Sequence, residues 1–211
     1  LLEETGIDSS LVPEIRPSFS EQGRVSKKGA EEPGLPEGIP IMYRAGDQPN
    51  NALALNVMEP GQIAATGGTS GVVYAISGQQ RTQEHTRINS FAHVNHSKDA
   101  TRIGKLLCIN GTGIQYSWMK NELTDGLSYN DMNQMAEKVT IGSDGLSILP
   151  FGNGAERMLE NRGKGSRILN LNFNIHKKSH LFRAALEGIA FAFVHGMEIL
   201  QNDGVDISSI K

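Results

Sequence analysis

The stretch that decides the fold spans residues 39–76 and reads IPIMYRAGDQPNNALALNVMEPGQIAATGGTSGVVYAI. Its first apolar run is typical of a short strand, and a run of mostly small residues then favours a helix that Pro60 and Gly61 end. Two further apolar runs, joined by the turn GGTSG, predict a hairpin. The predicted order is a strand over residues 39–44, a helix over 51–58, and hairpin strands over 62–66 and 72–76.

Composition limits the class of protein. The chain has 211 residues and a net charge of −3, with 38% apolar and 20% charged residues, which is ordinary for a globular protein. This balance gives no reason to expect a nucleic-acid or membrane partner, and no apolar run reaches the roughly 18 residues of a membrane span. The single cysteine, Cys108, cannot form an internal disulfide, so we expect a cytoplasmic location.

Outside the central stretch, apolar runs separated by polar turns give way to helical patterns. The short apolar runs predict a meander of antiparallel strands, and the later period-3.6 patterns predict helices, so the class is α/β. The chain opens within a helical pattern and closes at the approach to a strand, which predicts a piece of a longer protein. Strands are predicted over residues 63–76, 88–94, 106–109 and 146–151, and helices over 1–5, 114–121, 128–139 and 179–202.

Asp47 is the first candidate for chemistry. A carboxylate at the end of a strand and before a helix lies where α/β sheets place ligands, and it could accept a proton from a substrate hydroxyl. The alternative is a helix cap or an Asx turn ahead of Pro49. Gln48 could hydrogen-bond a polyol beside it.

Two glycine turns are candidate anion sites. The turn over residues 67–71 frees backbone N–H groups, and Thr69 and Ser70 add hydroxyl donors, although no lysine follows as in a Walker A loop. Gly113 lies at a strand-to-helix junction, where a helix N-terminus can face phosphate. The alternatives are an ordinary hairpin turn and an ordinary tight turn.

The sequence predicts no metal centre. His93 and His96 stand three residues apart at a strand end, where this spacing points the rings to opposite faces. Cys108 lies in an apolar run and is expected to be a buried, inert thiol.

Six segments in a fixed order carry a resemblance to a known family. They are GDQ at 46–48 with NALA at 51–54, GTSGVV at 68–73, FAH at 91–93, NGTGI at 110–114 with WMK at 118–120, LPF at 149–151 with GAER at 154–157, and HLFRAALEG at 180–188. In this order they resemble the central region of the FGGY carbohydrate kinases, over nearly the whole chain.

The resemblance implies an actin-like, ribonuclease-H-like ATPase fold, with parts of two domains and a cleft between them. Residues 1–61 would be the end of the sugar-binding domain, and residues 62–211 most of the nucleotide-binding domain. By the same resemblance Asp47 is the catalytic base and binds the sugar together with Gln48. The ATP-binding residues would be Gly68, Thr69, Gly113 and Ser117, with Mg²⁺ accompanying ATP and no protein metal ligand.

The implied activity is ATP-dependent phosphorylation of a sugar hydroxyl, with D-xylulose as the first choice. Glycerol, ribulose, rhamnulose and gluconate are open alternatives, and so is a non-catalytic actin-like module that binds nucleotide. The family's first phosphate hairpin and its adenine-side glycine motif are not found in these 211 residues, so the chain alone is expected to be inactive. A homodimer is an open alternative to a monomer. Residues 49–51, PNN, depart from the small residues usual in the family.

Overall fold

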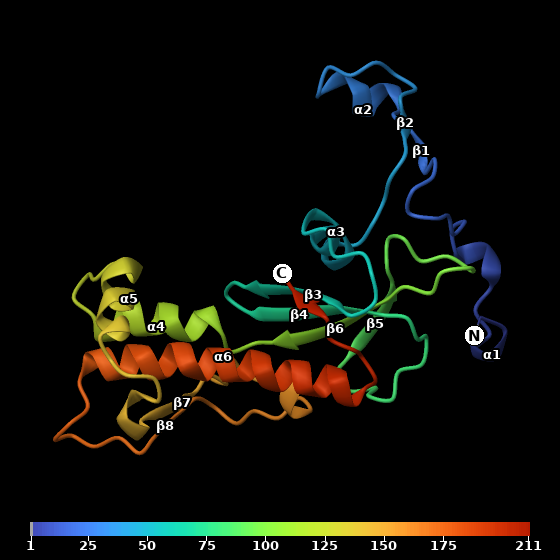
Figure 1. Ribbon diagram of the computed structural model, residues 1–211. Helices are drawn as coiled ribbons and strands as arrows, with labels where there is room; N and C mark the ends of the chain where they lie inside the picture. The colour runs from blue at the N-terminus through green and yellow to red at the C-terminus, as the bar shows by residue number, and fades with distance from the viewer. Residues whose placement is uncertain (1) are drawn as a thin grey trace.

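The computed structural model describes residues 2–211 and is built around one five-stranded sheet in the order β5-β6-β4-β3-β9 (Figure 1). The strands are β1 (Gly23–Arg24), β2 (Pro40–Ile41), β3 (Gln62–Gly67), β4 (Gly71–Ser77), β5 (Asn89–Ala92), β6 (Ile103–Ile109), β7 (Ser147–Leu149), β8 (Arg167–Leu169) and β9 (Ser209–Ile210). The helices are α1 (Leu2–Thr5), α2 (Lys27–Glu31), α3 (Asp47–Ala54), α4 (Gly113–Leu123), α5 (Tyr129–Glu137) and α6 (Lys178–Asn202), with three 3-10 turns at η1 (Ser9–Leu11), η2 (Ser143–Gly145) and η3 (Arg157–Leu159). Residue 1, where the first predicted helix starts, lies outside the described residues.

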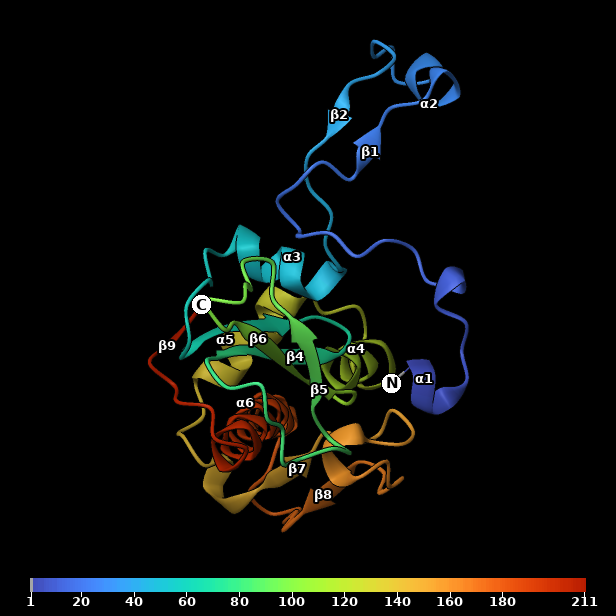
Figure 2. The ribbon, with the colours of Figure 1, turned by 90° about the vertical axis from the view of Figure 1, so that its right-hand side faces the viewer.

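Helices α3 and α6 cover opposite faces of the sheet, so the central strands are buried on both faces (Figure 1). Side chains alternate along a strand, so Val73 and Ala75 of β4 pack under α6, whereas Tyr74 and Ile76 pack under α3. The small β7–β8 pair lies beyond α6, on the side away from the sheet (Figure 2). The α/β class is therefore confirmed.

The sheet is not the simple meander that the sequence predicts. β6 pairs with both β4 and β5, with Leu106 opposite Tyr74 on one side and Asn89 on the other. β5 therefore lies at the sheet edge, although it follows β4 directly in the chain. At the other edge β9 is parallel to β3, with Gln62 opposite Ser209. The prediction was wrong because apolar alternation marks strands but contains no information about their neighbours.

Helix α6 begins one residue before the predicted residue 179 and ends at Asn202 as predicted, and small residues as well as large ones form its buried face. The closest approaches are made by small residues: Ala185 and Ala192 are buried, and a Cβ at Gly196 would lie 3.0 Å from the Leu107 side chain. A Cβ at Gly188 would lie 1.9 Å from the Ile148 carbonyl oxygen. Small residues let the helix axis come close to its neighbours, and the large side chains of Phe182 and Leu200 are fully buried at its two ends.

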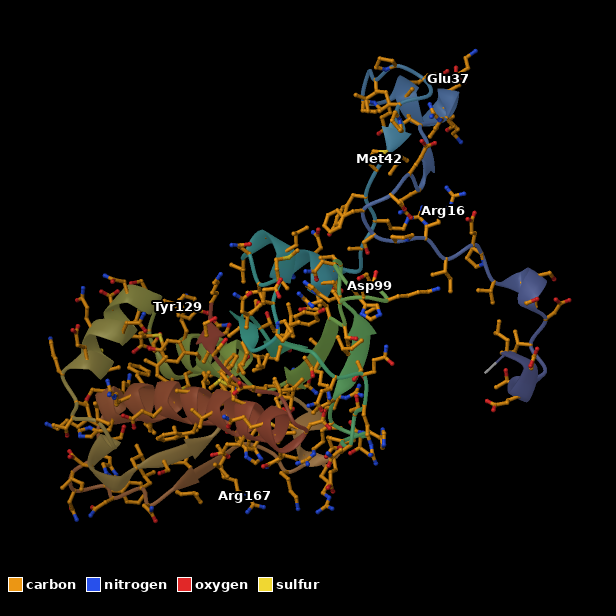
Figure 3. All side chains as sticks on the ribbon, turned by 45° about the vertical axis from the view of Figure 1, so that its right-hand side comes forward. Arg16, Glu37, Met42, Asp99, Tyr129 and Arg167 are labelled. Carbon is orange, nitrogen blue, oxygen red and sulfur yellow. The ribbon has the colours of Figure 1, made fainter. Side chains whose placement is uncertain are left out.

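Two boundaries in the central stretch also differ from the prediction. Helix α3 begins at Asp47 rather than at residue 51, because Gly46 takes the extended N-cap position and proline is tolerated in a first helical turn. The first strand shortens to β2, which pairs with β1 in a segment that stands away from the central sheet (Figure 2, and Met42 in Figure 3). Several apolar side chains of this segment are exposed, among them Ile15, Phe19 and Met42. No helix within residues 2–211 is long and apolar enough to cross a membrane.

A buried ion pair ties the end of α6 to the sheet. Lys105 and Asp203 have fully buried side chains and contact each other directly. The Lys105 ammonium also donates to the Arg81 carbonyl at 3.0 Å. The Asp203 carboxylate accepts backbone N–H groups of Gln83 at 2.6 Å and Glu84 at 2.8 Å. The pair therefore fixes the loop between β4 and β5 against the C-terminal end of α6.

We predict that Asp203→Leu lowers the free energy of unfolding by about 3–5 kcal/mol, because it leaves the Lys105 charge buried without a partner. The double variant Lys105→Met with Asp203→Leu should recover part of this loss. Urea unfolding followed by circular dichroism measures both. Glu160→Ala, which breaks an exposed pair with Arg162, is the matched control and should cost no more than about 1 kcal/mol. If Asp203→Leu is as stable as the Glu160→Ala control, Lys105 and Asp203 do not form a buried ion pair in solution.

Candidate functional site

The candidate base lies at the start of α3. Asp47 is the first residue of this helix and is exposed, and Gln48 follows it half-buried. The Asp47 Oδ1 atom accepts the Gln48 backbone N–H at 2.8 Å. The carboxylate is therefore turned back on its own helix end, where the positive end of the helix dipole stabilises a negative charge. The alternative that Asp47 caps the helix is wrong, because Gly46 occupies the N-cap position and Asp47 is the first residue of the helix.

The Cys108 thiol of β6 responds to several charges, among them that of Asp47. Burial raises the pKa of this thiol most, the Arg157 charge lowers it, and the negative charges of Glu156 and Asp47 raise it further. Cys108 pairs with Val72, next to Gly71 at the hairpin turn. Cys108 is half-buried rather than fully buried, so the expectation of a buried thiol holds only in part.

The hairpin turn and the N-terminus of α4 are joined by backbone hydrogen bonds. The Gly113 N–H donates to the Gly68 carbonyl at 3.1 Å, and the Ile114 N–H donates to the Thr69 carbonyl at 3.0 Å. A Cβ at Gly113 would lie 2.2 Å from the Gly68 oxygen, so only glycine permits this approach. The first N–H groups of α4 bind the hairpin, and they are not available to hold an anion as the sequence allowed.

This junction gathers the four sequence-predicted ATP residues around one open pocket of about 440 Å³. Its wall contains Gly68, Thr69, Gly113 and Ser117, together with Gly67, Ile114 and Tyr129. The backbone N–H groups of Thr69 and Ser70 donate to no group within residues 2–211, and neither do their hydroxyls. Free donors at a glycine turn beside an open pocket are suited to bind an anionic group.

Tyr129 is a pocket residue that sequence reasoning treated only as part of a helix. It begins α5 (Figure 3) and is 45% exposed. Its ring stacks on that of Tyr116 with 5.9 Å between the centroids. The Lys120 ammonium lies 5.3 Å from the centre of the Tyr129 ring. The pocket therefore has an aromatic wall with a cation beside it. The only sequence signal was an aromatic residue at the start of a polar-faced helix.

Glu156 is a second residue whose role the sequence did not indicate, although it lies in the GAER segment. Its carboxylate is buried, with the residue 1% exposed, and accepts backbone N–H groups of Asn110 at 2.9 Å and Gly111 at 3.2 Å. The Met158 N–H donates to it at 3.4 Å. A buried carboxylate needs such donors to offset the loss of water. Glu156 thus fixes the turn that leads from β6 into α4.

The two histidines of the HxxH spacing do not share a site. The His93 ring is buried and its Nδ1 lies 3.0 Å from the Tyr74 hydroxyl, whereas the His96 Nδ1 accepts the Arg102 backbone N–H at 3.1 Å. Burial lowers the pKa of His93. Within residues 2–211 no group of three or more His, Cys, Asp and Glu side chains could hold a metal ion.

We predict that Gly113→Ala lowers the free energy of unfolding by about 1–3 kcal/mol, because the new methyl group must displace the Gly68 carbonyl and with it the hairpin. Alanine favours helices more than glycine does, so helix propensity alone predicts the opposite sign. The sign of the change in the free energy of unfolding, measured by urea denaturation, decides between steric clash and helix propensity. Gly163→Ala is the control, since its Cβ would meet nothing within 4 Å. If both variants are equally stable, the tight junction is not present in solution.

Comparison with known proteins identifies relatives of this chain. Residues 63–211 match the model of the C-terminal domain of the FGGY family of carbohydrate kinases. Gluconokinase of Bacillus subtilis is 28% identical over 200 residues, covering 90% of this chain and 38% of that protein. Xylulose kinase of Staphylococcus epidermidis is 25% identical over 204 residues, covering 95% and 39%. The chain thus spans about two fifths of the length of these relatives.

Solved structures give the same fold. Xylulose kinase from Rhodospirillum rubrum superposes with a TM-score of 0.84 and 26% identity over 99% of this chain and 41% of that one. Glycerol kinase from Plasmodium falciparum, solved with ADP, gives a TM-score of 0.82 at 23% identity over 100% and 42%. The actin-like α/β fold is therefore confirmed. With its C-terminal-domain match over most of its length, this chain belongs to the FGGY family of carbohydrate kinases.

Proposed function

We propose that the protein containing this chain transfers the γ-phosphoryl group of ATP to a hydroxyl of a sugar. The observation that carries the proposal is the pocket where Gly68, Thr69, Gly113 and Ser117 meet, two from the hairpin and two from α4. Asp47 supports it, because this carboxylate at the start of α3 is exposed and has no cation partner within residues 2–211. A phosphate cradle and a proton acceptor are the two groups that such a reaction needs.

The proposed reaction proceeds as an in-line displacement. The sugar hydroxyl gives its proton to the Asp47 carboxylate while its oxygen bonds to the γ-phosphorus, and the bond from that phosphorus to the bridging oxygen of ADP breaks. The N–H groups and hydroxyls of Thr69 and Ser70 would stabilise the charge that develops on the phosphate oxygens. Gln48 would hold a second sugar hydroxyl. Mg²⁺ would arrive as MgATP, bound by phosphate oxygens, and supply further charge neutralisation.

The proposed boundary between the two domains lies directly before the hairpin strand β3. Residues 1–61 would belong to the sugar-binding domain, because they contain Asp47 and Gln48, the two proposed sugar contacts at the start of α3. Residues 62–211 would form most of the nucleotide-binding domain, and the family match to residues 63–211 supports that boundary. Tyr129 offers a face on which the planar base of a nucleotide could stack. We expect a cytoplasmic enzyme, since the one cysteine is free.

We predict that Asp47→Asn, in the longest natural chain that contains this sequence, lowers kcat about a hundredfold or more, because the amide cannot take the proton. ATP affinity should change little, since Asp47 does not line the pocket around Thr69. A coupled ADP-release assay and nucleotide titration measure the two effects. Asp99→Asn, at an exposed loop residue, is the matched control (Figure 3). Turnover near wild type in Asp47→Asn would remove this residue from the mechanism.

The substrate is proposed to be D-xylulose, giving D-xylulose 5-phosphate. Similarity to xylulose kinases in both sequence and structure supports it. A gluconokinase of similar identity keeps gluconate as the main alternative. We predict the highest kcat/KM for D-xylulose in a panel that also holds gluconate, glycerol, ribulose and rhamnulose. A gluconate value above that for D-xylulose would reassign the substrate but leave the phosphoryl-transfer chemistry untouched.

A further inference from the structure

Lys120 places a positive charge beside the pocket around Thr69. Its ammonium lies 5.3 Å from the centre of the Tyr129 ring, and Tyr129 lines that pocket. Within residues 2–211 this ammonium forms no ion pair and no hydrogen bond. None of the described residues that line the pocket is charged. Lys120 is therefore a cation at the rim of an uncharged pocket, and no carboxylate of the described chain neutralises it.

Helix α4 brings Lys120 to the same face as the pocket wall. Successive residues of an α-helix are about 100° apart, so Ser117 lies about 40° from Gly113 around the helix axis. Lys120 lies about 20° from Gly113 on the other side. Gly113 and Ser117 both line the pocket. Helical side chains lean toward the N-terminus of their helix, so the long Lys120 side chain can reach back along this face to a ligand beside Ser117.

The aromatic ring that holds the ammonium is itself held by the core. Tyr129 stacks on Tyr116, which is 8% exposed. The Tyr116 hydroxyl donates to Asn133 Oδ1 at 2.9 Å, and its ring packs edge-on against Phe182. A cation over an aromatic ring at a partly exposed site is held weakly, and a phosphate oxygen binds it more strongly. Tyr129 therefore keeps the ammonium near the pocket without preventing its transfer to an anionic ligand.

We propose that Lys120 binds the phosphate chain of the nucleotide in the pocket around Thr69, at the phosphates nearer the ribose. Thr69 and Ser70 at the hairpin tip would hold the transferred phosphate. Lys120 is about 10 Å farther along α4 than Gly113, the residue that contacts the hairpin, so its ammonium would meet the remaining phosphates. This inference rests on the proposed function, because it requires a nucleotide in the pocket.

The position of the charge decides which property of the enzyme it controls. ATP and ADP share the phosphates nearer the ribose, and these phosphates are not transferred. A cation at them stabilises bound nucleotide equally before the reaction and in the transition state. Lys120 should therefore control the affinity for nucleotide and have little effect on the rate of the transfer step.

The binding test compares variants in the longest natural chain that contains this sequence, by calorimetric titration with ADP. Lys120→Met should raise the Kd of ADP about tenfold, because a charge-assisted hydrogen bond to phosphate is lost. Lys120→Arg keeps the charge and should retain most of the affinity. Lys138→Met, at an exposed lysine directly after α5, is the matched control and should bind ADP as the wild type does.

The kinetic test separates affinity from catalysis. In a coupled ADP-release assay with the best sugar of the panel at saturation, Lys120→Met should raise the KM for ATP about tenfold. Its kcat should change less than about threefold, because the lost contact is the same in the ground state and the transition state. A fall in kcat at an unchanged KM would place Lys120 at the transferred phosphate and overturn the assignment to the other phosphates.

Two binding results would overturn the proposal by itself. The first is a Kd of ADP for Lys120→Met within about twofold of the wild-type value. The second is equally weak binding by Lys120→Arg and Lys120→Met, which would show that the charge is not what binds. Failure of the proposed kinase function looks different, because the wild type would then phosphorylate no sugar while Lys120 still controlled ADP binding. A wild type that binds no ADP would overturn both.

Discussion

The contact on which the site depends is the pair of backbone hydrogen bonds from the start of α4 to the hairpin turn. Gly113 and Ile114 donate to consecutive carbonyls, and the absence of a side chain at Gly113 is what allows the two segments to approach. The contact joins residues more than forty positions apart in the chain, so it defines a pocket that neither segment contains alone. Within residues 2–211 the amide groups at the tip of the turn donate to no other group.

The same turn is supported from its other side by a buried carboxylate. Glu156 gathers the backbone N–H groups that lead into α4, and the Asn110 side chain adds a bond to the Ala155 carbonyl at 2.7 Å. Gly111 meets the Pro150 carbonyl so closely that a Cβ would lie 1.8 Å from it. The turn between β6 and α4 is thus held between the hairpin and the loop after β7. Such a position favours a rigid cradle, since rigid donors need no reorganisation when charge develops.

Close approach of backbone segments recurs through the fold. At α6, glycines and alanines let the helix lie against the sheet and against the Ile148 carbonyl. The buried Lys105–Asp203 pair then fixes its far end. These contacts hold α4, α5 and the β7–β8 pair around one long helix.

The sequence by itself determined the elements and the candidate residues. Apolar spacing located the hairpin, the helix around Trp118 and the long C-terminal helix, and the ordered motifs indicated the family together with Asp47 and the glycine turns. Periodicity and motif order are local properties, so one chain suffices to read them. Only the tertiary structure decided that β6 separates β4 from β5, that the α4 amides bind the hairpin, and that Tyr129 and Glu156 join the site. These depend on packing and hydrogen bonds between distant residues, which no local pattern encodes.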